Sequence, residues 1–428
     1  MADILIIGAN GYCGRLIARY LLTHPERQNF TVALAVRSKS KLSAFKLPID
    51  DSVKIFELDV HDFVPLEAAV KQVKVVINAA GPYWRYGSPV VIACARNGVH
   101  YVDITGETAW IYRIIRHFDY LASQNHAIII PSCGVDSLPS DAVVHLANKT
   151  LKAARRDAQI DTSVTAAQLS GGIGGGTIST SVVRIEEISP NFLELAEKDW
   201  SLSPVVGKSV PNQRMVYKLP SPGPSSPMYG AIWPMAAINR AIVQRTWGLR
   251  EYARHYAAVP PLDANEASYG PAFTYEEFYP TRSAIVAFAM SVAMMFGSWC
   301  LTVAPIRWLF KRLVTQPGNG PAESTLDNGF MHFVNITTST ETPPTYVKTT
   351  MAGTGDPGFI LTAIMVSESA LAILLQKDQL PALAARGGVL TPMTALGDVV
   401  LTRLQSTGRF DYSSMVVDKN QAEGKKTR

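Results

Sequence analysis

The sequence predicts an α/β protein in which a doubly wound parallel sheet is followed by a second, α+β domain. The chain has 428 residues, more than one ordinary hydrophobic core supports. Short apolar runs alternate with helical stretches over its first third, which is typical of a parallel sheet with crossover helices. From about residue 160 this alternation ends. We therefore expect a first domain over 1–150, a second over 151–390, a C-terminal helix and strand over 391–418 that pack back on the core, and a disordered basic tail over 419–428.

Six strands are expected in the first domain, because six short apolar and β-branched runs are separated by helical stretches. The expected strands are Ile4–Ile7, Thr31–Val36, Val53–Leu58, Val73–Asn78, Val99–Asp103 and Ala127–Ile130. The helices between them include Tyr12–Leu22, Val90–Asn97 and Thr108–Gln124.

The second domain is expected to begin with a strand and a glycine-rich turn, Gly171–Gly176, which either approaches a ligand through its backbone or serves as a hinge. Residues 201–230 are rich in Pro and Ser and are predicted to be a loop. The expected strands of this domain are Asp161–Leu169, Gly329–Thr338 and Thr345–Ala352, and the expected helices that follow them or the turn are Thr177–Glu187, Phe359–Leu375 and Met393–Leu404.

The composition indicates a globular protein and excludes several classes. Hydrophobic residues make up 47% and charged residues 18%, and the formal net charge is only +5. No dense basic stripe is interleaved with aromatic residues, so we expect no nucleic-acid partner. The four cysteines form no C-x-x-C pair and have no histidine cluster near them, so we expect reduced thiols and no metal site. An apolar strand starts almost at once and runs into a glycine motif, so we expect no signal peptide.

A glycine motif follows the first strand and predicts a dinucleotide site. The segment Gly8-Ala9-Asn10-Gly11-Tyr12-Cys13-Gly14 has the spacing G-x-x-G-x-x-G between a strand and a helix. Gly8 permits a tight turn, Gly11 lets a pyrophosphate approach the backbone, and Gly14 allows the helix to pack closely on the strand. The helix N-terminus at Tyr12 favours the phosphate charge. Residues 1 to about 150 are therefore predicted to form a Rossmann domain.

The residue after the second strand favours NADP(H) over NAD(H). NAD-binding proteins place an acid there, which binds the ribose hydroxyl, whereas this chain has Arg37 with Ser38 and Lys39 beside it. A cation suits a 2′-phosphate; the alternative is a solvated arginine at a strand end. The remaining expected contacts are Asp59 near the adenine, and Asn78, Ala80 and Gly81 near the ribose and nicotinamide.

Four residues near the expected nicotinamide are candidates for proton transfer. Tyr83 and Tyr86 follow the fourth strand, and Asp103 and Glu107 bracket the turn after the fifth. Aromatic packing is the alternative for the tyrosines, and helix capping is the alternative for the acids. The segment Asp136-Ser137-Leu138-Pro139-Ser140-Asp141 also follows a strand, and Ser137 is expected either to serve the site or to cap a helix.

Several motifs together resemble the saccharopine dehydrogenase-like oxidoreductases. The resemblance covers nearly the whole chain and lies in Gly81-Pro82-Tyr83-Trp84-Arg85-Tyr86-Gly87, Tyr101–Glu107, Gly134–Asp141 and Gly387–Pro392. It implies an NADP-type Rossmann domain with an inserted α+β domain. The family includes saccharopine reductases, animal proteins associated with membranes or lipid droplets, and bacterial trans-acting enoyl reductases that act on polyketide-derived lipids. Because the second domain offers few clustered cations, this chain resembles the lipid-directed branch more than the saccharopine enzymes.

The segment Ala284–Ala304 is uncharged and is long enough to cross a bilayer. Strands expected before and after it belong to one domain, so a single span would separate strands that must pair. We therefore expect it to lie in one leaflet as two short helices broken near Gly297–Ser298, with Trp299 and Trp308 at the interface. Headgroups would be contacted by Arg307, Lys311 and Arg312. The alternative is a buried core or dimer-interface helix.

These expectations combine into two classes of function. The first is an NADPH-dependent oxidoreductase that transfers a hydride to a lipophilic small molecule or acyl thioester, by reduction of an enoyl C=C bond of a polyketide- or fatty-acyl-type substrate. A saccharopine-type reductase is the enzymatic alternative. The second is a non-catalytic NADP-binding membrane or lipid-droplet protein. We expect the cytoplasmic face of a membrane or lipid droplet as the location, otherwise the cytoplasm, and a homodimer remains open.

Overall fold

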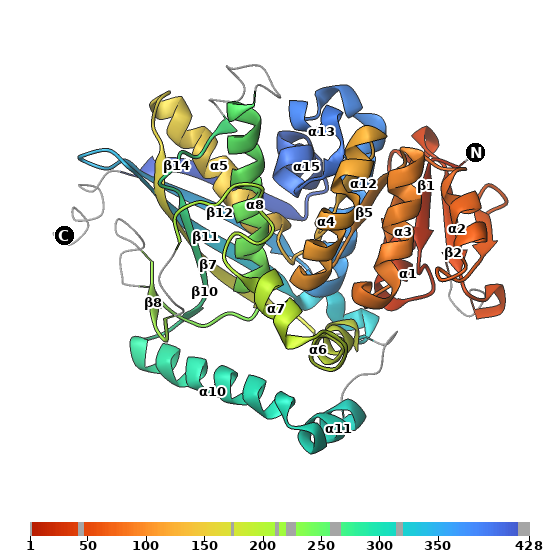
Figure 1. Ribbon diagram of the computed structural model, residues 1–428, viewed down its shortest axis with the longest axis horizontal. Helices are drawn as coiled ribbons and strands as arrows, with labels where there is room; N and C mark the ends of the chain where they lie inside the picture. The colour runs from red at the N-terminus through yellow and green to blue at the C-terminus, as the bar shows by residue number, and fades with distance from the viewer. Residues whose placement is uncertain are drawn as a thin grey trace.

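Two seven-stranded sheets lie side by side in the computed structural model, with helices between and around them (Figure 1). The structure describes residues 2–41, 47–172, 175–209, 214–219, 228–256, 267–313 and 320–417. The expected basic tail at 419–428 and residues 173 and 174 of the glycine-rich turn lie outside the described residues.

The first sheet is parallel and has the strand order β13-β6-β5-β4-β1-β2-β3. This is the order of a doubly wound Rossmann sheet with one strand added beside β6, so the predicted fold class is confirmed. The strands are β1 (Ile4–Ile7), β2 (Val32–Val36), β3 (Lys54–Glu57), β4 (Val75–Asn78), β5 (His100–Asp103), β6 (Ile128–Ile130) and β13 (Gly388–Val389).

Helices cover both faces of the first sheet, because its strands bury side chains on both sides. Ile4 and Ile6 of β1 belong to one core cluster, and Leu5 and Ile7 belong to the other. One face is covered by α1 (Tyr12–Leu22) and α12 (Thr362–Leu375), and the other by α2 (Phe63–Val70), α3 (Tyr83–Asn97) and α4 (Thr108–Gln124).

The second sheet is mixed and has the order β14-β12-β11-β7-β10-β9-β8. Among the described strands, β7 and β10 pair in parallel and the other neighbours are antiparallel. Its strands are β7 (Ile160–Ser170), β8 (Tyr217–Lys218), β9 (Tyr229–Ala231), β10 (Thr274–Thr281), β11 (Phe330–Ser339), β12 (Tyr346–Thr354) and β14 (Phe410–Val417). Helices α5 (Leu138–Ala154) and α8 (Ala236–His255) pack on it.

The two halves exchange elements along the chain. Helix α5 precedes residue 155 but packs on strands of the second sheet, whereas α12 and β13 come from late in the chain and complete the first. Strand β14 returns to pair with β12. The domain limits at 150 and 390 stay predictions. The remaining helices are α6 (Gly175–Glu187), α7 (Pro190–Glu197), α10 (Ala284–Thr302), α11 (Ala304–Leu313), α13 (Ala382–Arg386), α14 (Pro392–Ala395) and α15 (Gly397–Ser406).

Helices α1 and α4 have the predicted bounds, but other expectations were wrong. Helix α3 begins at Tyr83 rather than Val90, and Pro89 lies inside it, because the Glu107 carboxylate accepts hydrogen bonds from the first amides of the helix. The segment expected to be a loop, 201–230, contains β8 and the start of β9.

Helix α8 and strand β10 were not predicted. In α8 the polar residues Asn239, Gln244, Arg245, Arg250 and Glu251 are buried, so its sequence lacks the apolar stripe by which a packed helix is normally recognised.

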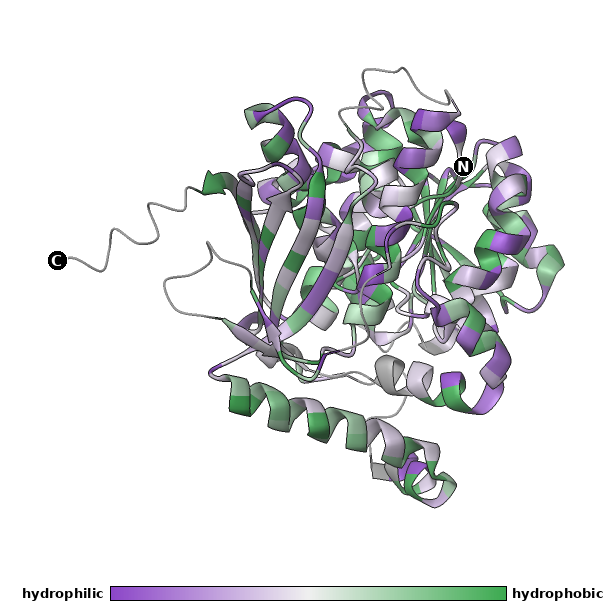
Figure 2. Ribbon diagram, turned by 60° about the vertical axis from the view of Figure 1, so that its left-hand side comes forward, coloured by the Kyte–Doolittle hydropathy of each residue, from purple (hydrophilic) through white to green (hydrophobic). Residues whose placement is uncertain are grey.

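Among the residues that the structure describes, two helical segments are long and apolar enough to cross a membrane, Ala284–Thr302 and Pro357–Leu375. The second is mostly buried and forms part of the core, whereas only 11% of the first is buried. Figure 2 shows the first, α10, running along one edge of the molecule and apolar over its length. The expected break near Gly297–Ser298 is absent, since α10 is continuous to Thr302, and α11 follows from Ala304.

Candidate active site

A cavity of about 810 Å3 lies at the carboxyl ends of the first sheet's strands. Its wall includes residues that follow five of them: Gly8, Arg37, Asp59, Ala79 and Ile104. Helices α6, α8 and α10 contribute the opposite wall. The pocket therefore has two halves. The half built from the Rossmann turns is called the cofactor half, and the half built from α6, α8 and α10 is called the second-domain half.

The glycine motif forms the narrow turn that the sequence predicts. Gly8 has φ +79°, and a Cβ there would lie 3.0 Å from the Ala80 nitrogen. A Cβ on Gly14 would lie 2.1 Å from the Gly8 carbonyl oxygen, so α1 packs against this turn with no space for a side chain. Gly11 and Tyr12, at the start of α1, line the pocket with Asn10. The turn and the helix N-terminus thus fit a dinucleotide pyrophosphate.

The residues expected around the ribose and adenine surround the same half of the pocket. Arg37 is exposed at the end of β2 and lines the cavity, as do Asp59, Ala80 and Gly81. The Ser38 and Asn78 side chains bond elsewhere: the Ser38 hydroxyl contacts that of Ser40 at 2.8 Å, and Asn78 Nδ2 donates to the Tyr101 hydroxyl at 3.1 Å. An exposed guanidinium at this position suits a 2′-phosphate.

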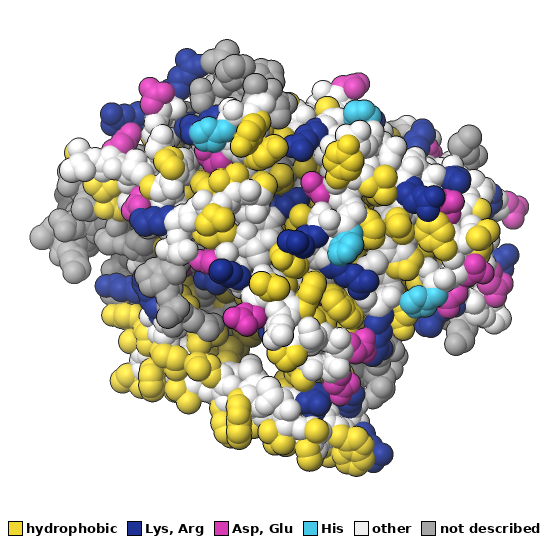
Figure 3. Space-filling view, viewed as in Figure 1, with side chains coloured by type: hydrophobic (Ala, Val, Ile, Leu, Met, Phe, Trp, Pro, Cys, Tyr) yellow, Lys and Arg dark blue, Asp and Glu magenta, His cyan; other side chains and the backbone are white. Residues whose placement is uncertain are grey.

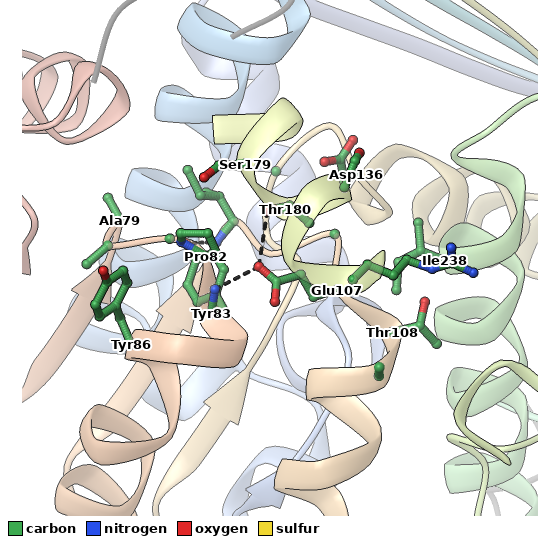
Figure 4. A pocket seen from close by; sticks show the side chains of 18 of the residues that line it. Ala79, Pro82, Tyr83, Tyr86, Glu107, Thr108, Asp136, Ser179, Thr180 and Ile238 are labelled. Carbon is green, nitrogen blue, oxygen red and sulfur yellow. Dashed lines mark hydrogen bonds between the residues drawn. The ribbon is translucent and has the colours of Figure 1, made fainter. Parts of the chain in front are cut away.

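The two tyrosines have different surroundings, although both stand on the first turn of α3. The Tyr83 hydroxyl donates to the Asn78 carbonyl oxygen at 2.8 Å, and burial raises its pKa well above the usual value. Tyr86 lines the pocket beside Ala79, and its ring contacts that of His61 with centroids 5.3 Å apart (Figure 4). Tyr83 thus has a structural hydrogen bond, and Tyr86 lies in the cofactor half.

The two acids after β5 are both engaged in hydrogen bonds. Asp103 is fully buried, and its carboxylate accepts from the Thr105 and Ser132 amides at 2.9 Å and from the Tyr101 hydroxyl at 2.8 Å. Glu107 lines the pocket and accepts from the Tyr83 and Trp84 amides at 2.7 Å. Glu107 therefore caps α3, the helix before its own, and it contacts Thr180 of α6 (Figure 4).

Asp136 is a further carboxyl that lines the pocket. It follows β6 and faces the cavity across from Glu107 (Figure 4). A Cβ on Gly106 would lie 3.2 Å from its Oδ2, so the glycine leaves space for the carboxyl. Among the described residues, none donates a hydrogen bond to it. Burial raises the pKa of Asp136 to about 7, and the Glu277 charge adds to the effect.

The residue after Asp136 has a strained backbone. Ser137 has φ +111°, a conformation that non-glycine residues rarely adopt and that often marks a functional site. It stands at the N-cap position of α5, but its hydroxyl donates to Asn239 Oδ1 at 2.9 Å and makes no capping hydrogen bond to the helix. Asn239 in turn donates to Glu277 Oε1 at 2.7 Å.

The polar network behind Asp136 is buried. Glu277 is 4% exposed, and its other oxygen accepts from the Ser140 and Tyr275 hydroxyls at 2.6 Å. Burial raises the pKa of Glu277. The network connects α5, α8 and β10, and it holds the main chain on which Asp136 stands.

The second-domain half of the pocket combines polar and apolar side chains. Two of its three described cations are paired: Arg184 donates twice to Glu197 at 2.7 Å, and Arg240 lies 3.4 Å from Asp199, while Lys198 lines the same wall. The apolar part of the lining consists of Ile185, Ile188, Pro234, Met235, Ala237, Ile238, Ala241 and Leu301. This apolar part suits an elongated apolar group.

The comparisons with known proteins agree with this geometry. Residues 4–166 match the model of the saccharopine dehydrogenase NADP binding domain. Over 428 residues the sequence is 32% identical to a Mycobacterium tuberculosis (strain ATCC 25618 / H37Rv) protein named "Putative trans-acting enoyl reductase", covering 95% of this chain and 96% of that protein. The chain belongs to the saccharopine dehydrogenase-like oxidoreductase family.

Two further proteins are similar to this chain. A protein of Mycobacterium bovis (strain BCG / Pasteur 1173P2) named "Trans-acting enoyl reductase" is 29% identical, with 95% of this chain and 96% of that protein covered. The saccharopine dehydrogenase (L-Glu forming) of Saccharomyces cerevisiae superposes with a TM-score of 0.49 at 13% identity, covering 98% and 100% of the two chains.

As a saccharopine dehydrogenase-like oxidoreductase, the chain is an NADP(H)-binding enzyme. The glycine turn, the N-terminus of α1 and Arg37 are the residues that would hold the cofactor. The sequence predicts these residues, but it does not single out Asp136 as a proton donor, because Asn239 and Glu277 of the network behind it lie more than 100 residues away in the chain.

Proposed function

We propose that this oxidoreductase reduces the C=C bond of an enoyl group on a lipophilic acyl substrate, with NADPH as the reductant. The names of the mycobacterial relatives support this substrate class. The observation that carries the proposal is that apolar residues of the pocket's second-domain half, among them Ile238 and Leu301, line the same cavity as the Asp136 carboxyl, whose pKa is raised to about 7. A group that can still be protonated at neutral pH suits a proton donor.

The chain's own residues would divide the work. Bound NADPH supplies the hydride that conjugate reduction delivers to the β-carbon. Asp136 holds a proton on the oxygen that faces the pocket and donates it to the α-carbon, so that the product gains one hydride and one proton. The apolar residues Ile185, Ile188 and Ile238 exclude water from this part of the pocket.

Glu107 acts through helix α3. Its carboxylate holds the first amides of α3, and the loop before that helix, Ala80-Gly81-Pro82, lines the cofactor half. We therefore assign Glu107 a positioning role. Tyr86 stays a candidate for a contact with the cofactor, since it lies beside Ala79.

Two alternatives are tested by the same assay. A saccharopine-type reductase must bind several carboxylates, which argues against it because two of the three cations described in this wall, Arg184 and Arg240, already pair with acids. A non-catalytic NADP-binding protein would bind the cofactor and turn nothing over. The experiment is NADPH oxidation against a panel of enoyl thioesters of rising chain length, beside an amino acid and keto acid pair. We expect turnover that improves with chain length; turnover of the pair alone, or a silent panel with intact NADPH binding, would contradict the proposal.

A further inference from the structure

The exposed apolar side chains of this protein are concentrated on one feature, the helix pair α10–α11. Eighteen large apolar residues are exposed among the described residues, and ten of them lie between 285 and 309. Figure 3 shows hydrophobic side chains gathered along this edge of the molecule. Soluble monomers rarely expose a contiguous apolar surface of this kind without a binding partner.

The side chains on α10 are arranged as one outward stripe. Its most exposed members recur at helical spacing, and the opposite face holds the two buried residues of the helix, Ala287 and Ser291. Ser291 anchors that face, since its hydroxyl donates to the Met215 carbonyl oxygen at 2.8 Å and accepts from the Ile232 amide at 3.0 Å. The stripe consists of Ile285, Phe288, Val292, Met295, Phe296 and Trp299.

The charges of the segment favour a lipid surface over a second copy of the chain. No acidic or basic residue lies between Arg282 and Arg307, so the flanks of the stripe are uncharged as well. A packed helix pair in water normally has charged residues along the edges of its apolar seam. Beyond this stretch the charged residues up to 312 are all basic, Arg307, Lys311 and Arg312. Arg307 and Lys311 share one acid, Glu186, so the cluster keeps a net positive charge, which suits anionic headgroups.

The sheet pairing determines how such a helix can meet a membrane. Strand β10 ends at Thr281, just before α10, and pairs with one edge of β7. Strand β11, which follows α11 in the chain, pairs with the other edge of β7. Both ends of the helix pair therefore remain on one side of the bilayer. A helix held in this way lies in the interface of one leaflet, with Trp299 and Trp308 among its exposed residues.

The pocket connects to this helix pair. Ser298 and Leu301 of α10 line the same cavity as Gly11 and Asp136. Helix α11 is also joined to the pocket wall, because Glu186 of α6 pairs with Arg307 at 3.0 Å and with Lys311 at 2.7 Å. The exposed helix and the candidate proton donor, Asp136, thus border the same cavity.

We propose that α10 and α11 dock on an anionic lipid surface and that the pocket receives its substrate from that surface. The docking stands on the exposed helix pair alone. The delivery of substrate rests on the proposed function, and the two parts fail separately in the tests below.

Docking is tested by flotation of the full chain with vesicles of phosphatidylcholine, with and without phosphatidylglycerol. The test variant is Phe296→Glu, whose side chain is 62% exposed, and the matched control is Val64→Glu on α2, 77% exposed. We expect wild type and Val64→Glu to float with anionic vesicles and Phe296→Glu to lose at least about tenfold in partitioning. Unchanged melting temperature and NADPH affinity show that each variant is folded.

Three results would overturn the docking proposal. The wild type could stay with the soluble fraction, or the two glutamate variants could float equally. Sedimentation could also show a dimer that Phe296→Glu dissociates, with no binding to vesicles, and a second copy would then be the occupant. For delivery, Phe296→Glu should lower turnover of a long-chain enoyl thioester held in vesicles and leave a short soluble one unchanged. If Phe296→Glu turns over the vesicle-held thioester as fast as the wild type does, delivery is refuted. If the proposed function itself is wrong, the wild type turns over neither thioester.

Discussion

The two halves of the pocket are built in different ways. The cofactor half consists mainly of main chain and small residues that follow consecutive strands, such as Gly8, Gly11 and Ala80. The second-domain half consists of side chains from helices far apart in the chain, such as Ile185, Ile238 and Leu301. The first half therefore recognises a group that the family has in common, and the second half can vary with the substrate.

The largest effect is expected from the cofactor half. A Cβ on Gly11 would contact only the Gly8 carbonyl oxygen, at 3.2 Å, so Gly11→Val can fold but fills the space needed by the pyrophosphate. We expect it to abolish NADPH binding, measured by fluorescence titration. A matched change, Gly297→Val, has nothing within 4 Å and should bind normally. Normal binding by Gly11→Val would remove the glycine turn from the site.

Asp136→Asn is expected to lower kcat by about a hundredfold or more and to leave NADPH affinity unchanged. The protonated form of Asp136 donates the proton, and its pKa is about 7. The kcat of the wild type should therefore fall as the pH rises above 7, and the variant should not show this alkaline limb of the pH–rate profile. The matched control is Asp59→Asn in the cofactor half, which should retain the limb. If Asp136→Asn keeps near-normal turnover, the proton comes from another group.

Arg37→Asp is expected to narrow or reverse the preference for NADPH over NADH. The wild type should bind NADPH at least about tenfold tighter, which corresponds to about 1.4 kcal/mol, because the guanidinium faces the cofactor half. Dissociation constants of both cofactors for both proteins measure this. Equal wild-type constants, or selectivity that survives the substitution, would make Arg37 a surface residue.

The smallest effect concerns stability. The pKa of Asp136 in the folded chain, about 7, exceeds its ordinary value of 3.8, so the folded state binds more protons between these values. Stability from this group is therefore present at low pH and is lost as the pH rises to 7. The melting temperature of Asp136→Asn should exceed that of the wild type by more at pH 8 than at pH 5. A difference that does not change with pH would contradict the raised pKa.

The sequence predicts the cofactor half well for a physical reason. Its residues lie directly after strands whose apolar runs are continuous, and the glycine spacing is local. The second-domain half depends on α8 and on Glu277 of strand β10, neither of which was predicted. Helix α8 buries Arg245 and Glu251, so its sequence does not have the apolar stripe that is typical of a core helix. The role of Glu107 was also missed, because it caps a helix that precedes it by more than 20 residues.

The most direct test of the account follows the enoyl substrate itself. Purified chain, NADPH and a long-chain enoyl thioester are incubated, and the acyl product is analysed by mass spectrometry beside the loss of NADPH absorbance. We expect the saturated acyl group, heavier by two hydrogen atoms, formed in proportion to NADPH consumed and sharply reduced in Asp136→Asn. An unchanged enoyl thioester in the presence of bound NADPH would contradict the assignment of this pocket to enoyl reduction.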